Sequence, residues 1–219
     1  MGFVIDVLPA ADIDRLEALW RELLSHHLRD APHLAALGTA RAPEDSWRVR
    51  RRQYLQWLAA PRATVLAAQS PGRLLGYAML RAVDAAGSWQ WGDQVGVLET
   101  LVVSSDARGE HVGQALLNAA RARLAAWDIQ VMTISVIAGN DGAMRFYRRE
   151  GASDYLHTLI MPVTNPHADM SKPAATGEMA GVVKVARAGT TVNMGPPLVC
   201  RCLRGTSRSA RSHSSMTCM

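Results

Sequence analysis

Residues 1–163 of this 219-residue chain contain neither cysteine nor lysine. Without cysteine, this part can form no disulfide and no cysteine-based covalent intermediate. The three cysteines of the chain all follow residue 163, at Cys200, Cys202 and Cys218. An odd number without framework spacing argues against a secreted disulfide scaffold and predicts a reducing, cytoplasmic setting. The Cys-x-Cys pair lacks a second pair or a histidine cluster to complete a tetrahedral site, so we expect no metal.

An excess charge of either sign is also absent from residues 1–163, where 17 arginines balance 17 aspartates and glutamates. The net charge of +5 therefore lies wholly in residues 164–219. A balanced body does not favour nucleic acid as a partner. A basic arm for nucleic acid stays open as the functional interpretation of the last 56 residues.

Long hydrophobic runs are missing as well. No apolar run reaches the roughly eighteen residues of a membrane-spanning helix, and the N-terminus lacks the basic flank and apolar stretch of an export signal. We therefore expect neither a membrane anchor nor export. With 48% hydrophobic residues, the chain nevertheless has ample material for a buried core.

Helical and strand periodicity both stop after Pro162. Residues 164–219 are rich in Ser, Thr, Gly, Ala, Pro and Met, with short apolar runs. This composition predicts a low-complexity, largely disordered basic tail. Because every lysine and cysteine falls in it, we consider a shifted reading frame or a recent fusion as its origin. We expect one folded domain over 1–163 and the tail over 164–219.

Strands alternate with helices before that point. Apolar residues at helical spacing predict helices over 9–24, 43–58, 112–124 and 140–149. Strands are expected over 3–8, 63–69, 74–83, 98–103, 130–137 and 155–163. A Ser-Pro-Gly-Arg turn at 70–73 joins two of these strands into an antiparallel hairpin. The order predicts a mixed α/β (α+β) fold, with a hairpin followed by two β-α units.

The expected helix over 43–58 carries four arginines, Arg48, Arg50, Arg51 and Arg52. They could face an anionic substrate. Because Glu44 precedes Arg48 by four residues, the spacing of a helical ion pair, a solvated helix face is favoured.

Two tryptophans, Trp89 and Trp91, alternate in the lead-in to the strand over 98–103. Alternation predicts that both rings share one face of the strand. They either pack in the core or a pocket wall, or line a substrate site.

The turn over 108–113 opens the third expected helix and is suited to an anion, above all a pyrophosphate. A helix N-terminus has backbone N–H groups without internal partners and a partial positive charge. Gly109 and Gly113 allow close approach of a ligand, and Arg108 adds a fixed charge. No G-x-G-x-x-G follows an early strand and no Gly-Lys-Ser/Thr occurs, so neither a Rossmann nor a P-loop site is expected.

Three motifs in this part resemble the GNAT superfamily of acetyl-CoA-dependent N-acyltransferases. They are Leu-Glu-Thr-Leu-Val-Val at 98–103, Arg-Gly-Glu-His-Val-Gly-Gln-Ala-Leu-Leu at 108–117 and Asn-Asp-Gly-Ala-Met-Arg-Phe-Tyr at 140–147. The resemblance covers residues 3–163 by order of elements and is most specific over 98–151. It implies a central, mostly antiparallel sheet flanked by helices. It also implies acetyl transfer from acetyl-CoA, as cosubstrate, to a primary amine of a small molecule or peptide. Homodimers are common among such proteins.

The resemblance also assigns the acetyl-CoA contacts. The backbone of Leu101 and Val103 would bind the pantetheine arm, and the loop over 108–113 would wrap the pyrophosphate. Where the family has a glycine this chain has His111, which would crowd the phosphates, contact them when protonated or, as we favour, lean outward. Asn140 would contact pantetheine or a water, cap the helix, or do both. The expected set is Leu101, Val102, Val103, Arg108, Gly109, Glu110, His111, Val112, Gly113, Gln114, Asn140, Ala143 and Phe146.

Two residues are candidates for proton transfer. Freeing the lone pair of an amine with a pKa near 10 costs about 4 kcal/mol at neutral pH and calls for a base. Glu99 should share a strand face with Val97 and Leu101, and is either this base or half of a structural ion pair. Tyr147 occupies the general-acid position of the family, or its ring simply packs beside Phe146.

The reaction implied is direct attack of the amine on the thioester, with a backbone N–H near Val102 polarising the carbonyl. The alternative is a catalytically silent acyl-CoA-binding or sensor module of the same fold. His111 favours this alternative, whereas Glu99 and Tyr147 favour the enzyme. Small amines, aminoglycosides, polyamines and protein amines all stay open as acceptors.

Overall fold

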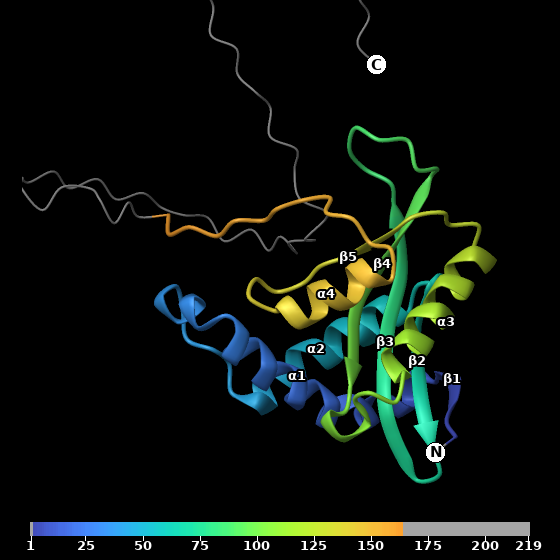
Figure 1. The fold of residues 1–219 in the computed structure, drawn as a ribbon, viewed down its shortest axis with the longest axis horizontal. Coiled ribbons are helices and arrows are strands. Elements are labelled where there is room, and N and C mark those ends of the chain that lie inside the picture. The colour runs from blue at the N-terminus through green and yellow to red at the C-terminus, as the bar shows by residue number, and fades with distance from the viewer. Residues whose placement is uncertain (1, 164–219) are drawn as a thin grey trace, which may run out of the picture. The chain divides into compact units, whose positions relative to one another are not determined.

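The computed structural model describes residues 2–163, which form a five-stranded sheet with helices on both faces (Figure 1). The strands, in their order across the sheet, are β1 (Val4–Leu8), β2 (Ala63–Ser70), β3 (Arg73–Asp84), β4 (Gln94–Val103) and β5 (Met132–Ile134). Neighbours from β1 to β4 are antiparallel, and β5 is parallel to β4. This mixed sheet confirms the predicted fold class.

The main helices are α1 (Glu17–Asp30), α2 (Pro43–Leu58), α3 (Val112–Ala126) and α4 (Asp141–Arg149). Short 3₁₀ turns are η1 (Ala10–Leu16), η2 (Pro32–Ala36) and η3 (Ser105–Ala107). Pro43 is tolerated at the start of α2 because the first N–H groups of a helix have no internal acceptor, and this helix has the predicted bounds. Among residues 2–163, no helix has the length and apolar character that a membrane crossing requires.

Each face of the sheet has its own hydrophobic core. Leu80 and Leu98 pack with α3 and α4 on one face, whereas Tyr77 and Met79 pack with η1, α1 and α2 on the other. Successive residues of a strand point to opposite faces, so a one-residue slip of β3 would exchange these two sets. Burying each such large side chain stabilises the fold by about 1.5–3 kcal/mol. The register of the sheet is therefore strongly fixed.

A β-bulge interrupts β4 at Glu99. On β3, Met79 pairs with Thr100 and Leu80 pairs with Leu98, so Glu99 has no partner between them. An extra residue of this kind shifts the alternation of the bulged strand by one position. The part of β4 after the bulge therefore points its side chains and amides opposite to the way its sequence pattern predicts.

The strands β4 and β5 separate soon after they meet. Pairing joins Gly96–Leu98 to Met132–Ile134 and then ends, although β4 continues to Val103. The predicted strand over 130–137 is thus too long. Residues 99–103 of β4 follow the last pair with β5, which leaves their backbone on that side available to other partners.

Residues 155–163 do not form the predicted strand. They are irregular and exposed, with Leu159 at 92% and Met161 at 82% exposure. Residues prone to β-structure form a strand only where a neighbouring edge satisfies their backbone, and this segment pairs with none of the five strands. The predictions made for 164–219, including the domain boundary at 163, lie outside the described residues.

The two tryptophans before β4 do not share a strand face as predicted. Both lie in the irregular loop between β3 and β4. Trp89 is 66% exposed, and the ring of Trp91 meets Tyr155 edge-on at 4.8 Å. The glycines at 87 and 92, both at positive φ, break the extended backbone that alternation requires. The prediction that Trp89 packs in the core is therefore wrong.

Candidate active site

The direction of the backbone amides reverses along β4. The Gly96 N–H donates to the Val131 carbonyl at 2.8 Å, toward β5. The Ser104 N–H donates to the Leu75 carbonyl at 2.8 Å, on the β3 side. Without a bulge, two residues eight positions apart would point the same way. The reversal follows from the extra residue at Glu99.

The N–H groups at the end of β4 point alternately toward β3 and toward the side where β5 has ended. Val102, two residues before Ser104 and opposite Tyr77, points its N–H to β3. The N–H groups of Leu101 and Val103 therefore point to the side where β5 has ended. They are suited to an extended ligand that carries amides, which would bind as an added strand. The predicted N–H near Val102 that polarises the substrate would then belong to Leu101 or Val103, because the Val102 N–H points to β3.

The loop 104–111 connects these amides to the start of α3. No side chain caps this helix, and its first internal hydrogen bond runs from the Ala115 N–H to the His111 carbonyl, at 3.0 Å. The N–H groups of residues 112–114 consequently have no acceptor within the helix. Together with the positive end of the helix dipole they favour an anion.

His111 takes a backbone conformation that suits glycine. Its φ of 59° and ψ of 13° are left-handed, and its side chain is exposed. For a residue with a Cβ this conformation costs roughly 1–2 kcal/mol. The glycine of the family pattern at this position thus has a conformational reason, and the exposed imidazole agrees with the outward-leaning interpretation.

The loop before α3 is held in place from two sides. The Ser105 N–H donates to Glu22 Oε2 on α1 at 3.1 Å. Asp106 accepts a hydrogen bond from the Ser104 hydroxyl and forms an ion pair with Arg73 at the start of β3. The Ser104 hydroxyl and the Arg73 charge lower the pKa of the Asp106 carboxyl. The loop is therefore ordered without a ligand.

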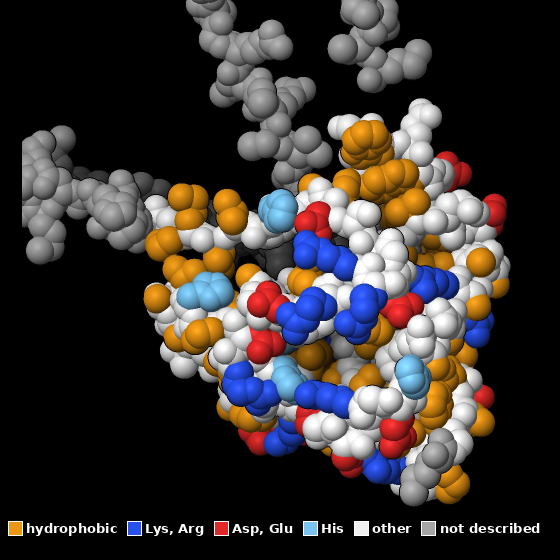
Figure 2. Space-filling view, in the orientation of Figure 1, with side chains coloured by type: hydrophobic (Ala, Val, Ile, Leu, Met, Phe, Trp, Pro, Cys, Tyr) orange, Lys and Arg blue, Asp and Glu red, His pale blue; other side chains and the backbone are white. Residues whose placement is uncertain are grey.

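A chain of basic side chains lies beside this loop. His26 of α1 contacts Arg108 through Nε2 and Arg29 through Nδ1, the latter at 2.6 Å. A neutral imidazole has one acceptor nitrogen, so it can accept a hydrogen bond from only one of two guanidinium groups. Burial, followed by the charges of Arg108 and Arg29, lowers the pKa of His26. Figure 2 shows basic side chains beside a histidine on the surface over α1.

β4, α3 and α4 converge at Gly113. A Cβ built there would lie 3.5 Å from Val103, 3.8 Å from Phe146 and 3.9 Å from Leu101. The fold thus brings these four residues, all expected cofactor contacts, together. Asn140 caps α4, because its Oδ1 accepts a hydrogen bond from the Ala143 N–H at 2.9 Å.

Other members of the expected set point elsewhere. The side chain of Val102 is buried against α2, and that of Val112 is buried beneath α3. Gln114 donates to Glu150 at 3.1 Å, and Glu110 is exposed. The side chain of Val102 therefore lies away from the other expected contacts, and Val112 can offer only its backbone.

Glu99 forms an ion pair. Its Oε1 accepts a hydrogen bond from Arg81 Nε at 2.6 Å, with the Glu99 side chain 17% exposed. The Arg81 guanidinium lies 4.7 Å from the centre of the Trp57 ring, so the pair faces α2. Leu101 packs in the core on the opposite face, so the prediction that it shares a face with Glu99 is wrong. Sequence reasoning missed Arg81, because it comes from a separate strand and meets Glu99 only in the fold.

Tyr147 lies on the other side of β4. It packs in the core formed by α3 and α4, and its ring meets Phe146 edge-on at 5.1 Å. Burial raises the pKa of Tyr147 to about 12. Because Glu99 faces α2 and Tyr147 comes from α4, the two candidates flank β4 from opposite faces.

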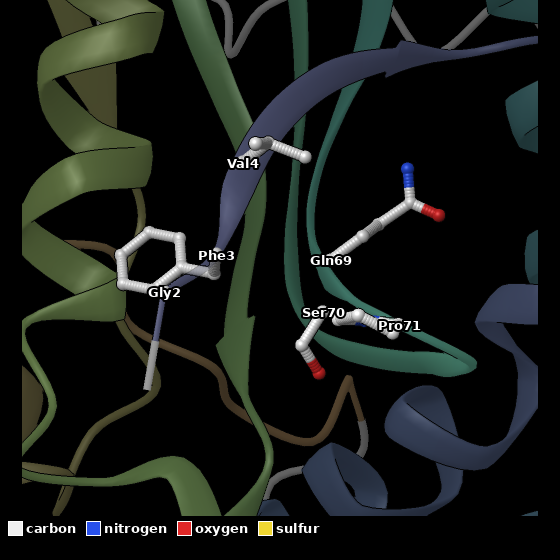
Figure 3. Close-up of a pocket in the computed structure, with 6 residues that line it drawn as sticks. All are labelled: Gly2, Phe3, Val4, Gln69, Ser70 and Pro71. Carbon is white, nitrogen blue, oxygen red and sulfur yellow. The ribbon is translucent and has the colours of Figure 1, made fainter.

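A pocket at the far edge of the sheet does not belong to this site. It lies between the start of β1 and the β2–β3 turn (Figure 3), and its lining is Gly2, Phe3, Val4, Gln69, Ser70 and Pro71. None of these side chains titrates, so the pocket offers no acid or base. Within residues 2–163, no cluster of three or more His, Cys, Asp or Glu is placed to hold a metal ion.

The sequence of residues 20–152 matches the model of the Acetyltransferase (GNAT) family. The chain belongs to the GNAT acetyltransferase family. Its fold is similar to that of a GCN5-related N-acetyltransferase from Ralstonia eutropha JMP134, with a TM-score of 0.58 and 21% identity over 74% of this chain and 100% of that one. No curated protein matches this acetyltransferase in sequence.

The fold of this GNAT protein is also similar to that of aminoglycoside N-acetyltransferase AAC(6')-Iy. In its complex with CoA, the TM-score is 0.56 and the identity 15%, over 74% of this chain and 94% of that one. In its complex with a CoA-acetylneamine bisubstrate analog, the TM-score is 0.56 and the identity 14%, over 75% and 100% of the two chains. At such identities the likeness shows the shared fold.

Proposed function

We propose that this GNAT protein transfers an acetyl group from acetyl-CoA to a primary amine by direct attack. The observation that carries the proposal is the end of β4, where two amides without a strand partner lead directly into an uncapped helix N-terminus. An extended arm with amides, followed by a pyrophosphate, is the ligand that this sequence of donors fits. Acetyl-CoA has this structure.

Each part of acetyl-CoA then has a place in the proposal. The N–H groups of Leu101 and Val103 bind the pantetheine arm, and Gly113 lets the start of α3 pack closely against β4 and Phe146. The pyrophosphate lies on the N–H groups of residues 112–114. Arg108 supplies charge beside it, and a phosphate would accept a hydrogen bond from the guanidinium group for which the neighbouring His26 has no acceptor nitrogen.

The transfer itself uses groups from both faces of β4. On the α2 side, Glu99 takes the proton of the amine through its second carboxylate oxygen, directly or through a water. The amine nitrogen forms the new C–N bond, and the Leu101 N–H stabilises the oxygen of the tetrahedral intermediate. The C–S bond then breaks toward the α4 side, where Tyr147 donates a hydrogen bond to the sulfur.

Tyr147 acts better as a hydrogen-bond donor than as a full acid. Its pKa is raised to about 12, whereas a thiol of this kind has a pKa near 8.5. Complete transfer of its proton to the thiolate would thus cost about 5 kcal/mol. We propose that Tyr147 keeps its proton and that solvent protonates the released thiolate.

A binding module without turnover is the second candidate. The hydrogen bond from Arg81 to Glu99 favours it, because a carboxylate held by a guanidinium is a weaker base. The uncapped helix and the free amides of β4 would serve both functions equally.

Release of free thiol from acetyl-CoA separates the two. We expect thiol release with at least one member of a panel of primary amines, and an acetylated amine of the matching mass. Calorimetric binding of CoA without thiol release from any amine would instead support the binding module. If the protein neither binds CoA nor releases thiol, both candidate functions are contradicted.

A further inference from the structure

We infer that the amine acceptor of this enzyme carries a carboxylate group, which Arg50 binds close to the Glu99–Arg81 pair. The inference rests on the acetyltransferase function proposed above and names its substrate class. The acceptor is a small amine that bears an acid, such as an amino acid, rather than a polycation.

Arg50 differs from the other arginines of α2. Arg48 pairs with Asp45 at 2.5 Å, and Arg51 pairs with Asp14 at 2.6 Å. Arg50 is partly buried, and within residues 2–163 no carboxylate forms an ion pair with it. The interpretation of these arginines as a solvated helix face therefore holds for Arg48 and Arg51 but not for Arg50.

Aromatic rings hold Arg50 instead of a counter-ion. Its guanidinium carbon lies 4.4 Å from the ring centre of Trp20, 5.6 Å from that of Tyr54 and 6.0 Å from that of Trp57. A guanidinium stacked on an aromatic ring keeps its in-plane N–H groups available. Those donors match the two oxygens of a carboxylate.

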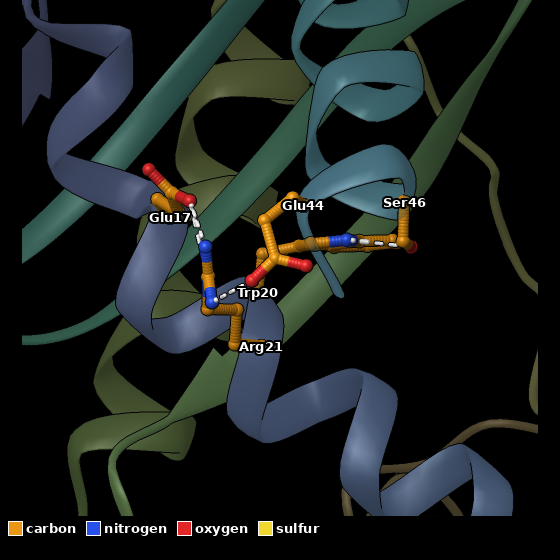
Figure 4. Close-up of polar contacts among 5 residues, drawn as sticks. All are labelled: Glu17, Trp20, Arg21, Glu44 and Ser46. Carbon is orange, nitrogen blue, oxygen red and sulfur yellow. Dashed lines mark hydrogen bonds and ion pairs between the residues drawn. The ribbon is translucent and has the colours of Figure 1, made fainter. Parts of the chain in front are cut away.

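The ring beneath Arg50 is fixed before any ligand binds (Figure 4). The Trp20 Nε1–H donates to Ser46 Oγ at 3.1 Å. Arg21 holds Glu17 of its own helix at 2.7 Å and Glu44 of α2 at 2.8 Å. The four-residue spacing predicts a pair between Glu44 and Arg48, but Glu44 pairs with Arg21 instead. These contacts tie α1 to α2 and lower the entropy cost of ordering Arg50 around a ligand.

The stacked Arg50 lies near the proposed base. Arg81, which binds Glu99, lies over the ring of Trp57 at 4.7 Å, and Arg50 lies 6.0 Å from the same ring. The two guanidinium groups are therefore no farther apart than these two distances combined. One small molecule can place its amine at Glu99 and its carboxylate at Arg50.

The charge around this ring favours an anionic group. The guanidinium groups of Arg50 and Arg81 both lie over the Trp57 ring, and only that of Arg81 pairs with a carboxylate, that of Glu99. Burial and the Arg50 charge lower the pKa of His27, so this histidine is neutral at pH 7 and leaves the arginines as the positive groups. A polycationic acceptor would meet an unbalanced positive charge, which opposes its binding. The carboxylate of an amino acid would balance it.

Matched acceptor pairs that differ in one carboxylate test the inference. With acetyl-CoA and the full chain, we would compare lysine with cadaverine and phenylalanine with phenethylamine, and include neamine as a polycation. We expect kcat/KM to be roughly tenfold or more higher for the member with the carboxylate. Arg50→Gln should remove this preference by raising KM, and Arg50→Lys should restore part of it. Arg52→Gln, an exposed arginine of the same helix, is the control and should change neither member.

Binding of the products tests the same contact without turnover. N-acetylphenylalanine should bind the CoA-saturated protein more tightly than N-acetylphenethylamine, and Arg50→Gln should abolish the difference while CoA affinity stays unchanged. Acetylation of cadaverine, phenethylamine or neamine in preference to the acids would overturn the inference and leave the acetyltransferase function intact. An equal effect of Arg50→Gln on both members of a pair would also overturn it. If no amine releases thiol, the proposed function fails, and the binding comparison still decides whether Arg50 recognises a carboxylate.

Discussion

Glu99 is the residue that the bulge leaves unpaired in β4, and its carboxylate binds Arg81, two strand positions from the bulge on β3. Glu99 faces α2 by ordinary alternation with Leu98, and the bulge turns the amides of Leu101 and Val103, which follow it, toward the side that β5 has left. The proposed base and the proposed cofactor contacts thus meet at one bulge in β4.

Removing the charge of Glu99 should lower turnover without disrupting the fold. We expect Glu99→Gln to reduce kcat by about 100-fold or more, which is typical for loss of a positioned base, with CoA affinity unchanged. Arg81→Gln is the paired variant and should affect kcat less, because it frees the carboxylate. Steady-state kinetics and calorimetry measure both. Equal activity of Glu99→Gln and the unmodified protein would exclude Glu99 as the base.

Two tyrosine-to-phenylalanine variants should separate catalysis from stability. Tyr54 OH contacts Thr100 Oγ1 at 2.6 Å and Tyr77 OH at 3.2 Å, all in the buried core. Tyr54→Phe should therefore lower the free energy of unfolding by about 1–3 kcal/mol, because buried hydroxyls lose a partner. Tyr147→Phe keeps the packed ring and should cost under about 0.5 kcal/mol.

The same Tyr147→Phe variant should lower kcat through loss of the hydrogen bond to sulfur. Because the pKa of Tyr147 is raised to about 12, its hydroxyl stays protonated up to pH 10, so it should not set an alkaline limb below that pH. Chemical denaturation and a pH profile of kcat provide the measurements. A limb near pH 9 that Tyr147→Phe removes would argue that Tyr147 donates its proton fully.

Relieving the left-handed backbone at residue 111 should stabilise the protein. His111→Gly is expected to raise the free energy of unfolding by up to about 1 kcal/mol, the penalty of that conformation less the entropy of a glycine in the unfolded chain. CoA affinity should stay equal or increase, because the new residue has no side chain. His111→Ala keeps a Cβ and serves as the control. Weaker CoA binding by His111→Gly would show that the imidazole itself contacts the phosphates.

Acid should favour CoA binding through His26. Its pKa is lowered in the folded protein by burial and by Arg108 and Arg29, against the opposing charges of Asp30 and Glu22. The unfolded chain therefore binds more protons below pH 6.5, and His26 costs stability as the pH falls. A phosphate beside His26 favours its charged form, so CoA affinity should rise as the pH falls from 7.5 to 5.5.

The affinity for CoA should rise by up to roughly tenfold for each unit by which bound CoA raises the pKa of His26. Calorimetry at several pH values measures it, and His26→Gln reports the background from all other groups, including the phosphates of CoA. An identical pH dependence in the two proteins would show that His26 does not take part.

The sequence predicts most elements because their signals are local. Pro43 marks the start of α2, Asn140 caps α4, and the turn at 70–73 sets the first hairpin. The bulge at Glu99 has no local signal, since it depends on how β3 pairs with β4, and it places Leu101 on the face opposite Glu99. The predicted strand over 155–163 fails for a related reason, because β-propensity cannot state whether an edge is available.

The candidate site divides in the same way. Arg108, Gly113 and Asn140 stand in one continuous motif and could be found by pattern. Arg81 could not, and Arg50 could not be distinguished from the other arginines of its helix, because the two residues come from separate elements and meet only in the fold, around a ring of α2. Long-range pairs of this kind have no fixed spacing in a sequence.

Amide hydrogen exchange along β4 tests the central claim most directly. In the protein without ligand, we expect the Val102 amide to exchange slowly and those of Leu101 and Val103 to exchange fast. Saturating CoA should slow Leu101, Val103 and residues 112–114, and leave Val102 unchanged. If CoA binds and these amides keep their rates, the cofactor does not lie along the free edge of β4, and the account is contradicted.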